Sequence, residues 1–342
     1  MSAFFYDYGL FLAKAVTWVA AILVAVGGIA GLVRQLRAHS GDHLEVHNLN
    51  ERFEDLADAV AHALLPAGEF KKHLKQRRKA DKARHKAARH DQPPKRPRVF
   101  VLEFDGDLEA SQVNSLREEI SAVLQSAAEG DEVLLKLESS GGVVHGYGLA
   151  ASQLARLREA KLKLTVAVDK VAASGGYLMA CVADRIVAAP FAIVGSIGVV
   201  AQLPNFNRLL KKHEVDYELH TAGQYKRTLT LFGENTEAGR EKFQEELEDT
   251  HALFKSFVAE KRPQLPIEQV ATGEHWFGAR ALALKLVDAL QTSDDWLLAR
   301  VKDADLFQIR FKRHRPLSER MAGGFANLAS RLSRPSLPFL PR

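Results

Sequence analysis

The chain has 342 residues, of which 46% are hydrophobic and 26% charged, enough for one large domain with appendages or two modest domains. A small disulfide-stapled module is excluded, because the single cysteine, Cys181, can form neither an intrachain disulfide nor a cysteine-rich metal site. The net charge is +5, yet residues 71–98 hold 13 basic and two acidic residues, so this segment carries +11 and the remainder −6. Basicity therefore belongs to one segment, which argues against a general nucleic-acid-binding surface.

The N-terminal residues 1–40 contain a candidate membrane anchor. The run Ala15–Val33 has nineteen residues without a charge, and at about 1.5 Å per residue a helix of this length crosses the roughly 30 Å hydrocarbon core of a bilayer. A cleaved signal peptide would have a shorter apolar region and a basic start, whereas here Asp7 precedes the run. Arg34 and Arg37 follow it, and this favours a cytoplasmic body, although long domains can defy that rule and the side of the membrane stays open.

Residues 41–98 are expected to connect the anchor to the body. From about Asn48 to Leu65 the apolar residues have helical spacing, which predicts a short packing helix, with a partner-binding helix as the alternative. The basic run Lys71–Arg98 ends in the proline-containing segment Gln92–Pro97. Like charges extend a chain and prolines stop a helix, so we expect a linker here. It either is merely solvated or is attracted to anionic headgroups near the anchor.

The body, residues 99–312, alternates predicted strands and helices. They are a strand from 99 to 104, a helix from 110 to 128, a strand from 133 to 137, a helix to about 160, a strand from 163 to 168, a short helix, and strands at 186–188 and 197–201. This alternation predicts an α/β fold with parallel pairing, in which ligand sites gather at the carboxyl ends of strands. The uncharged stretch Ile186–Leu203 has a second membrane span as its alternative, but Pro190, Gly195 and Gly198 favour buried strands.

The remainder of the chain has weaker signals. A long amphipathic helix is predicted after Thr236, to about Lys261, and a shorter unit covers Gly278–Asp288. Residues 313–342 form a basic tail rich in proline and serine. We expect this tail to be loosely ordered or to act as an arm on a neighbouring subunit.

The strongest chemical signal is the run Val171–Tyr177, which follows a predicted strand. Ser174 would sit on a tight strand-to-helix turn beside small residues, which exposes its hydroxyl and aims the following backbone N–H groups into the same space. This pattern is typical of a catalytic nucleophile. The alternative is that Ser174 only caps the short helix.

A serine nucleophile needs a base, and no histidine lies between Gly146 and Lys212. His145 and His213 flank this gap, but neither has a local partner pattern. Lys226 follows the strand-like run Val215–His220 and could act as the base only in a dry pocket that removes its proton. The alternative is that Lys226 is an ordinary surface charge.

Three runs together closely resemble the signal peptide peptidase A family of membrane-anchored Ser/Lys-dyad proteases, and most of all its SohB branch. They are Asp169–Tyr177, Ala183–Ile186 and Gly195–Val199. The resemblance covers about Val99 to Ala289, and the upstream apolar span with its basic linker agrees with it.

The resemblance implies roles for individual residues. Ser174 matches the nucleophile of the family and Lys226 its general base, while Ser196 matches the hydroxyl that orients the lysine amine. The backbone N–H groups of Gly142 and Gly175 match the oxyanion donors. The turn that holds Gly142 departs from the family pattern, since it has a serine where relatives usually have proline.

The resemblance further implies a ClpP/crotonase-like spiral α/β fold, ring-like homo-oligomers and a place in the bacterial inner membrane. It implies serine endopeptidase activity on peptides or unfolded membrane-associated segments, with no cofactor, no metal and no nucleic-acid partner. One alternative is a catalytically inactive assembly scaffold on the same fold. Another is a crotonase-like acyl-CoA enzyme that uses Glu138, but this would leave Ser174 and Lys226 without a role.

Overall fold

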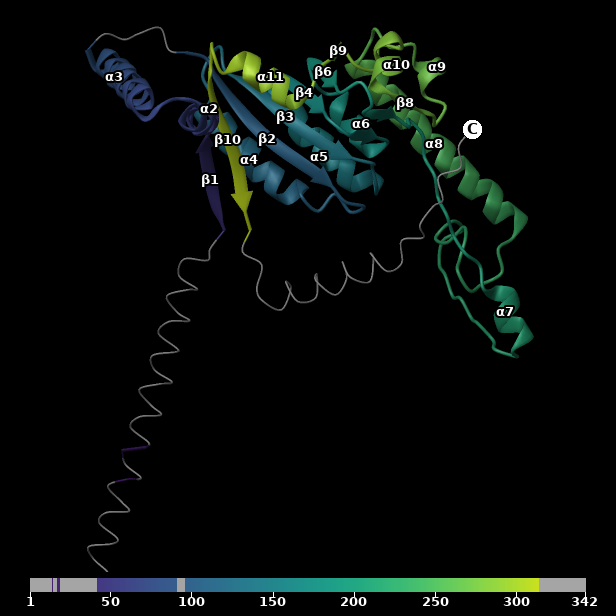
Figure 1. Ribbon diagram of the computed structural model, residues 1–342. Coiled ribbons are helices and arrows are strands. Elements are labelled where there is room, and N and C mark those ends of the chain that lie inside the picture. The colour runs from purple at the N-terminus through teal and green to yellow at the C-terminus, as the bar shows by residue number, and fades with distance from the viewer. Residues whose placement is uncertain (1–13, 15–16, 19–41, 91–95, 314–342) are drawn as a thin grey trace, which may run out of the picture. The chain divides into compact units, whose positions relative to one another are not determined.

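The computed structural model describes residues 14, 17–18, 42–90 and 96–313 (Figure 1). The expected anchor and the basic tail lie outside this part of the chain, apart from residues 14, 17–18 and 313. Among the described residues, the helices are all too short or too polar to cross a bilayer. Contacts divide the chain into two units, and residues 45–310 make up the compact unit that holds the site.

A mostly parallel sheet organises this unit, in the order β1-β10-β2-β3-β4-β6-β9. Its strands are β1 (His43–Asn48), β2 (Arg98–Gly106), β3 (Glu132–Ser139), β4 (Lys163–Val168), β6 (Arg185–Ala188), β9 (Ala289–Leu290) and β10 (Asp305–Lys312). Three short strands branch from the end of β3: β5 (Val171–Ala173), β7 (Ile193–Gly195) and β8 (His275–Phe277). β5 pairs with β3 at Ser139, and β7 pairs with β5. The branch therefore begins where the glycine-rich turn after β3 begins.

Helices cover both faces of the sheet (Figure 1). They are α2 (Leu49–Leu64), α3 (Ala67–His90), α4 (Val113–Ser126), α5 (Val144–Glu159), α6 (Gly175–Ala180), α7 (Asn207–Lys212), α8 (Glu237–Lys261), α9 (Ile267–Val270), α10 (Gly278–Ala283) and α11 (Ser293–Arg300). Alternate residues of β2 point to opposite faces: Phe100 and Leu102 join the larger core with α4 and α5, and Val99 and Val101 join the smaller core with α2 and α11. Both faces are apolar, which explains the continuous apolar runs in the sequence.

The central prediction of an α/β fold is confirmed. Strands β2, β3 and β4 and helices α4, α5 and α8 occupy the expected segments. The long helix begins after Thr236, whose hydroxyl accepts a hydrogen bond from the Gly239 N–H. The stretch Ile186–Leu203 contains β6 and β7, so the alternative of a second membrane span is wrong.

Two strand predictions are wrong. Residues 197–201 form no strand, because β7 ends at Gly195 and Val200 is 81% exposed. The strand-like run Val215–His220 is irregular and exposed along its length. Its alternation of apolar and polar residues fits a strand, but it has no pairing strand in the described chain, and alternation without hydrogen-bonding partners does not make a sheet.

The prediction of an extended linker is wrong for its first part, since α3 is helical through His90. Lysine, arginine and alanine are good helix formers, and the prolines come only after the helix. The neighbouring helix α2 also supplies counter-charge: the Arg77 guanidinium pairs with Glu54 at 3.0 Å and with Asp58. Opposite charge on α2 thus offsets part of the repulsion along α3.

The first turns of α2 belong to the folded unit, which begins well before the expected boundary at residue 99. Leu49 and Phe53 pack into the smaller core. The Asn50 side chain donates to the carbonyls of Val301 and Ala304 and accepts from the Leu306 N–H. The predicted packing helix is therefore confirmed for its N-terminal half.

Hydrogen bonds to Asp131 hold the first residue of β2 in place, and they lead to a first prediction, on stability. The Asp131 carboxylate is buried and accepts hydrogen bonds from the Arg98 backbone and guanidinium and from the Ala128 N–H. Burial alone would raise the pKa of Asp131, but these hydrogen bonds outweigh it and hold the pKa below its usual range. We expect Asp131→Asn to lower the free energy of unfolding by about 1–3 kcal/mol near neutral pH.

A lowered folded pKa stabilises the fold above the unfolded value of about 3.9, and this stabilisation disappears as the pH falls through the folded value. Urea unfolding should therefore show a difference between wild type and Asp131→Asn that shrinks towards about pH 2. Asp303→Asn, at an exposed aspartate, is the control and should change little. A difference that is constant with pH would contradict the assigned role.

Candidate active site

The turn between β5 and α6 places Ser174 in an unusual backbone conformation. Its φ is 53° and its ψ is −119°, a region that residues with a side chain rarely adopt. The Ser174 N–H donates to the Gly195 carbonyl at 2.8 Å, and the Ser174 carbonyl accepts from the Leu178 N–H at 3.0 Å. The side chain makes no capping hydrogen bond to α6, so the helix-cap alternative for Ser174 is wrong. A half-buried hydroxyl is left for other chemistry.

The glycine-rich turn after β3 lies directly against the Ser174 turn. Gly141 has a φ of +89°, and a Cβ added there would lie 2.7 Å from Ser174 Cβ and 2.8 Å from the Gly175 nitrogen. A Cβ at Gly142 would collide with the Leu108 carbonyl. Only residues without a side chain allow the two turns to approach this closely.

The expected oxyanion donors, Gly142 and Gly175, come from these two adjacent turns. Within the described residues, neither backbone N–H donates a hydrogen bond to the protein. An unengaged N–H pair beside a serine hydroxyl can donate hydrogen bonds to a negatively charged oxygen, which is the geometry that acyl transfer requires. The structure therefore places the predicted site residues Ser174, Gly142 and Gly175 in two adjoining turns.

Tyr147, which the sequence analysis missed, connects the two turns. Its hydroxyl lies 2.5 Å from Ser139 Oγ and donates to the Asp107 carbonyl at 2.8 Å. Ser139 Oγ in turn accepts from the Gly141 N–H at 3.1 Å. The Tyr147 ring packs against Gly175 so tightly that a Cβ there would overlap it. No local sequence motif predicts these contacts of Tyr147, because its partners come from segments far apart in the sequence.

Burial raises the pKa of Tyr147, so its phenol keeps the proton that it donates. The hydroxyl network is thus fixed near neutral pH. The network keeps the Gly141 N–H hydrogen-bonded to Ser139. It thereby fixes the backbone conformation of the turn that contains Gly142. Tyr147 is a positioning residue, since it reaches the site only through other residues.

Ser196 also lies close to the Ser174 backbone. It follows Gly195, whose carbonyl receives the Ser174 N–H, and it has a φ of 51°. The Ser196 N–H donates to the Glu274 carbonyl at 2.6 Å, and Gly195 packs against the Trp276 ring. These contacts hold Ser196 half-buried at the end of β7.

Lys226 lies in the segment 196–236 between β7 and α8, and its side chain is exposed. Its backbone N–H donates to the Gly223 carbonyl, while within the described chain its amine makes no hydrogen bond or ion pair. The single chain therefore does not join Lys226 to Ser174. His145 and His213 are exposed as well.

The other reactive groups near the site are occupied. Cys181, at the C-terminal end of α6, is fully buried, and burial raises the pKa of its thiol to about 12, so it is not a nucleophile near neutral pH. Glu138, the carboxylate of the acyl-CoA alternative, pairs with Lys170 at 2.8 Å. Among the described residues no cluster of His, Cys, Asp and Glu could hold a metal ion.

Buried hydrogen bonds and an ion pair hold α6 in place. The Tyr177 hydroxyl donates to the Leu286 carbonyl at 2.9 Å. Arg262, only 2% exposed, donates to both carboxylate oxygens of Asp288 at 2.8 and 2.9 Å. Because one Asp288 oxygen also accepts from the Ile186 N–H, the ion pair ties the helix layer to β6. Buried contacts thus hold the helix that follows the Ser174 turn in a fixed position.

A serine on a strained turn beside two unengaged backbone donors is the arrangement of a hydrolase that acts on carbonyl groups, and comparison with known proteins specifies the class. Residues 3–154 match Peptidase family S49 N-terminal and residues 156–306 match Peptidase family S49. The chain belongs to peptidase family S49, and it is a protease. Its relatives place it in the SohB branch of that family.

Two curated relatives illustrate this similarity. The chain is 49% identical over 319 residues to "Probable protease SohB" of Haemophilus influenzae, covering 91% of this chain and 90% of that protein. It is 50% identical over 304 residues to "Probable protease SohB" of Buchnera aphidicola subsp. Schlechtendalia chinensis, covering 87% and 99%. Among solved structures, the 1510-N membrane-bound stomatin-specific protease with a substrate peptide aligns at 12% identity and a TM-score of 0.42, covering 69% of this chain and all of that one.

The position of Tyr147 gives a second prediction. We expect Tyr147→Phe to keep the ring packing against Gly175 but to release Ser139 and the Gly141 turn. Loss of one oxyanion donor typically lowers kcat about 100- to 1000-fold, so a displaced donor should lower kcat by about 10- to 100-fold with little change in KM. Steady-state cleavage of a fluorogenic peptide measures both constants.

Tyr177→Phe is the matched control. It also removes one hydroxyl of a buried tyrosine, but that hydroxyl bonds to Leu286, away from the Gly141 turn. At about 1 kcal/mol for each buried hydrogen bond, Tyr177→Phe loses one such bond, and Tyr147→Phe loses two, those to Ser139 and Asp107. If the two variants had equal kcat, Tyr147 would contribute only to stability.

Proposed function

We propose that the chain is a membrane-anchored serine endopeptidase in which Ser174 and Lys226 form the catalytic dyad. The observation that carries this proposal is the turn at Ser174, where a hydroxyl that does not cap its helix lies beside the unengaged N–H groups of Gly142 and Gly175. The strand branch β5-β7-β8 beside the parallel sheet agrees with a ClpP/crotonase-like spiral fold. Ala15–Val33 would be the anchor in the bacterial inner membrane.

In the proposed reaction, neutral Lys226 accepts the proton of Ser174 as Oγ forms a bond to the peptide carbonyl carbon. The carbonyl oxygen takes up the negative charge and receives hydrogen bonds from Gly142 and Gly175. Collapse of this intermediate breaks the peptide C–N bond, and the proton held by Lys226 passes to the leaving amine. Water then attacks the acyl-enzyme, Lys226 takes its proton, and Ser174 is regenerated. Ser196 would orient the amine.

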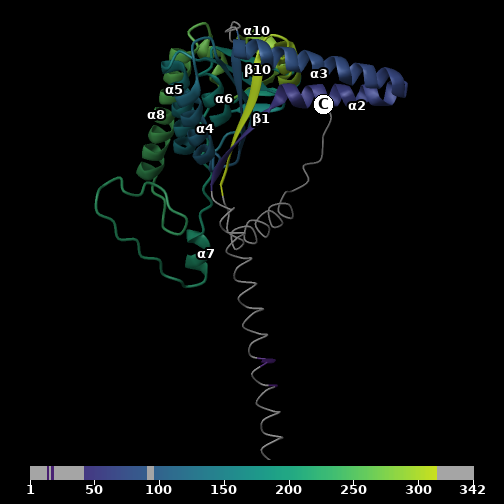
Figure 2. The same cartoon turned by 90° about the vertical axis from the view of Figure 1, so that its left-hand side faces the viewer.

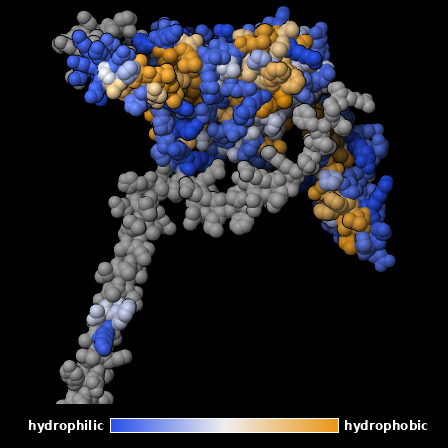
Figure 3. Space-filling model, in the orientation of Figure 1, coloured by the Kyte–Doolittle hydropathy of each residue, from blue (hydrophilic) through white to orange (hydrophobic). Residues whose placement is uncertain are grey.

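Lys226 is exposed in the single chain, and a base of this kind needs a dry site. The segment around it, residues 196–236, also exposes many apolar side chains, seen as an orange patch beside α7 (Figure 3). They include Val200, Phe206, Leu209, Tyr217 and Leu219. Apolar surface of this extent is typical of an interface. We propose that ring-like homo-oligomers bury this segment and enclose Lys226 beside Ser174.

The proposed substrates are peptides or unfolded membrane-associated segments. Leu108, whose carbonyl contacts the Gly142 turn, is 68% exposed, and Val144 on the other side of that turn is 56% exposed. Apolar side chains beside the oxyanion turn favour apolar residues next to the cleaved bond. An enclosed ring would admit only extended chains.

The dyad gives a third prediction. Ser174→Ala and Lys226→Ala should each lower casein cleavage at least about 10⁴-fold, as loss of a member of a catalytic unit does, without changing particle size. A fluorophosphonate probe should label wild type at Ser174 and label Lys226→Ala far more slowly. Lys212→Ala, which removes another exposed amine of the same segment, is the control and should keep full activity.

Cleavage by Lys226→Ala at the wild-type rate would exclude this residue as the base. A wild-type protein that neither cleaves casein nor reacts with the probe would instead support the inactive scaffold.

The exposed segment gives a fourth prediction. Leu209→Glu combined with Leu219→Glu should reduce the mass of the assembled particle and abolish cleavage, because charge at both positions opposes burial. Mass photometry and casein cleavage measure the two effects. Arg117→Glu with Arg185→Glu, at exposed positions outside the segment, should change neither. Full activity in a monomeric Leu209→Glu, Leu219→Glu protein would show that the site is complete in one chain.

A further inference from the structure

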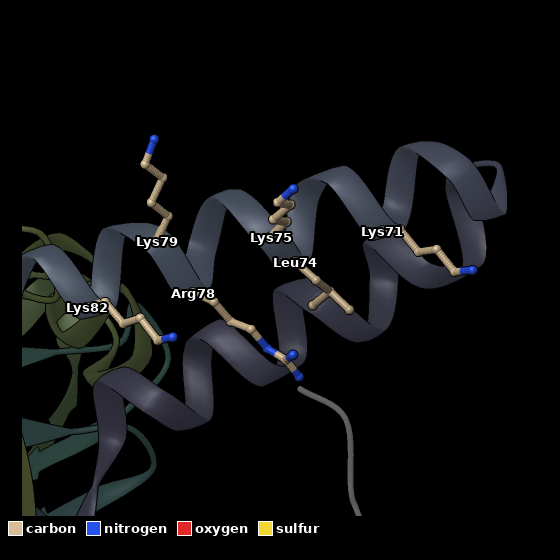
Figure 4. A pocket seen from close by; sticks show the side chains of 6 residues that line it. All are labelled: Lys71, Leu74, Lys75, Arg78, Lys79 and Lys82. Carbon is tan, nitrogen blue, oxygen red and sulfur yellow. The ribbon is translucent and has the colours of Figure 1, made fainter.

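Helix α3 carries a stripe of cations along one face. Lys71, Lys75, Arg78 and Lys82 follow helical spacing, so they lie in one row about 16 Å long. Together with Lys79 and Leu74 they line a shallow hollow of about 460 Å³ on the helix surface (Figure 4). We call these five cations the basic stripe.

The basic stripe has no ionic partners in the described part of the chain. Its side chains are exposed, and none of them makes a hydrogen bond or ion pair there. Arg77 differs from them, because it points to the neighbouring helix α2 and pairs with Glu54 and Asp58. α2 and α3 lie side by side (Figure 2), and their contact uses Arg77 and leaves the basic stripe unused. The fold therefore does not depend on the cations of the basic stripe, and the repulsion between them destabilises helix α3.

We propose that the basic stripe binds the headgroups of anionic phospholipids and so holds α3 on the bilayer surface; this rests on the proposed membrane anchoring. A row of exposed lysines and arginines is complementary to a plane of phosphate groups. Lysine stems and Leu74 can lie along the apolar boundary while the charged ends remain in the headgroup layer.

The neighbouring helix provides a second, independent observation. Leu56, Val60 and Leu64 of α2 are 56–76% exposed and recur every fourth residue. Exposed apolar residues and exposed cations together are the composition of helices that lie in a membrane interface. A purely solvated spacer would gain nothing from either row.

Nucleic acid and a second copy of the chain are the competing anionic partners. Binding of single-stranded nucleic acid typically uses aromatic side chains on which bases stack, and none lies among the residues of the hollow. The apolar run Ala15–Val33 precedes α3 by fewer than forty residues, so an inserted anchor would keep the basic stripe at high local concentration near the bilayer. Lipid is therefore the favoured partner.

The test uses the full chain reconstituted in lipid nanodiscs, with lysine acetylation read by mass spectrometry. Discs of phosphatidylcholine alone are compared with discs that contain phosphatidylglycerol. In the anionic discs we expect Lys71, Lys75, Lys79 and Lys82 to react about fivefold more slowly, and about 0.5 M NaCl should abolish this protection. Lys302, exposed elsewhere in the chain, is the internal reference and should react equally in both discs.

Two matched variants each remove four charges. The stripe variant combines Lys71→Gln, Lys75→Gln, Arg78→Gln and Lys82→Gln and leaves Lys79 as the reporter. The control variant changes four exposed cations elsewhere to glutamine and keeps the reference Lys302: Arg117, Lys161, Arg185 and Arg280. Lys79 should lose its protection in the stripe variant and keep it in the control variant, whose net charge is the same.

Equal acetylation of Lys79 in both kinds of disc would overturn the proposal. So would protection that arises in detergent without lipid and grows with protein concentration, which would indicate a second copy, or stronger protection by an RNA duplex at equal salt. Acetylation does not depend on peptidase activity, so failure of the dyad would leave this test intact. A chain that migrates only with anionic discs would support the basic stripe and contradict the anchor.

Discussion

The close approach of two backbone turns is the constraint on which the site depends. The turn after β3 and the turn after β5 touch at Gly141, Ser174 and Gly175, where side chains other than that of the serine would collide with backbone or with Tyr147. The pairing of β5 with both β3 and β7 brings these turns together. The same pairing directs the Ser174 N–H to the Gly195 carbonyl, so the strained serine conformation is held by the sheet and its hydroxyl is left free.

The strained backbone conformation of Ser174 persists only in rigid surroundings, and buried polar contacts make these surroundings rigid. Tyr147 and Ser139 fix the glycine turn, Tyr177 fixes α6 to the Leu286 carbonyl, and the buried ion pair of Arg262 with Asp288 connects the layer beneath to β6. The Ser174 hydroxyl and the neighbouring N–H groups of the two turns are thus held rigidly. Lys226, by contrast, lies in an exposed segment, so one half of the proposed dyad is preorganised and the other depends on burial of that segment.

The sequence analysis predicted the sheet well and its surroundings less well, for physical reasons. Strands such as β2 and β3 are apolar on both faces, so their runs are unmistakable. The helix α3 was mistaken for a linker because its charges are partly offset by α2, a contact that no local pattern reveals. The sequence singled out Ser174 because its turn is a local pattern, and its role stays a prediction. Tyr147 was missed because its partners come from β3, the loop after β2 and α6. Lys226 came from family resemblance, and its role stays a prediction.

A structure of the assembled particle in a membrane disc would test the account most directly, through one distance. We predict that in the assembly Lys226 Nζ lies about 3 Å from a Ser174 Oγ, within hydrogen-bond reach and shielded from water. An assembled, proteolytically active particle in which every Lys226 amine remains in solvent would contradict the proposed mechanism.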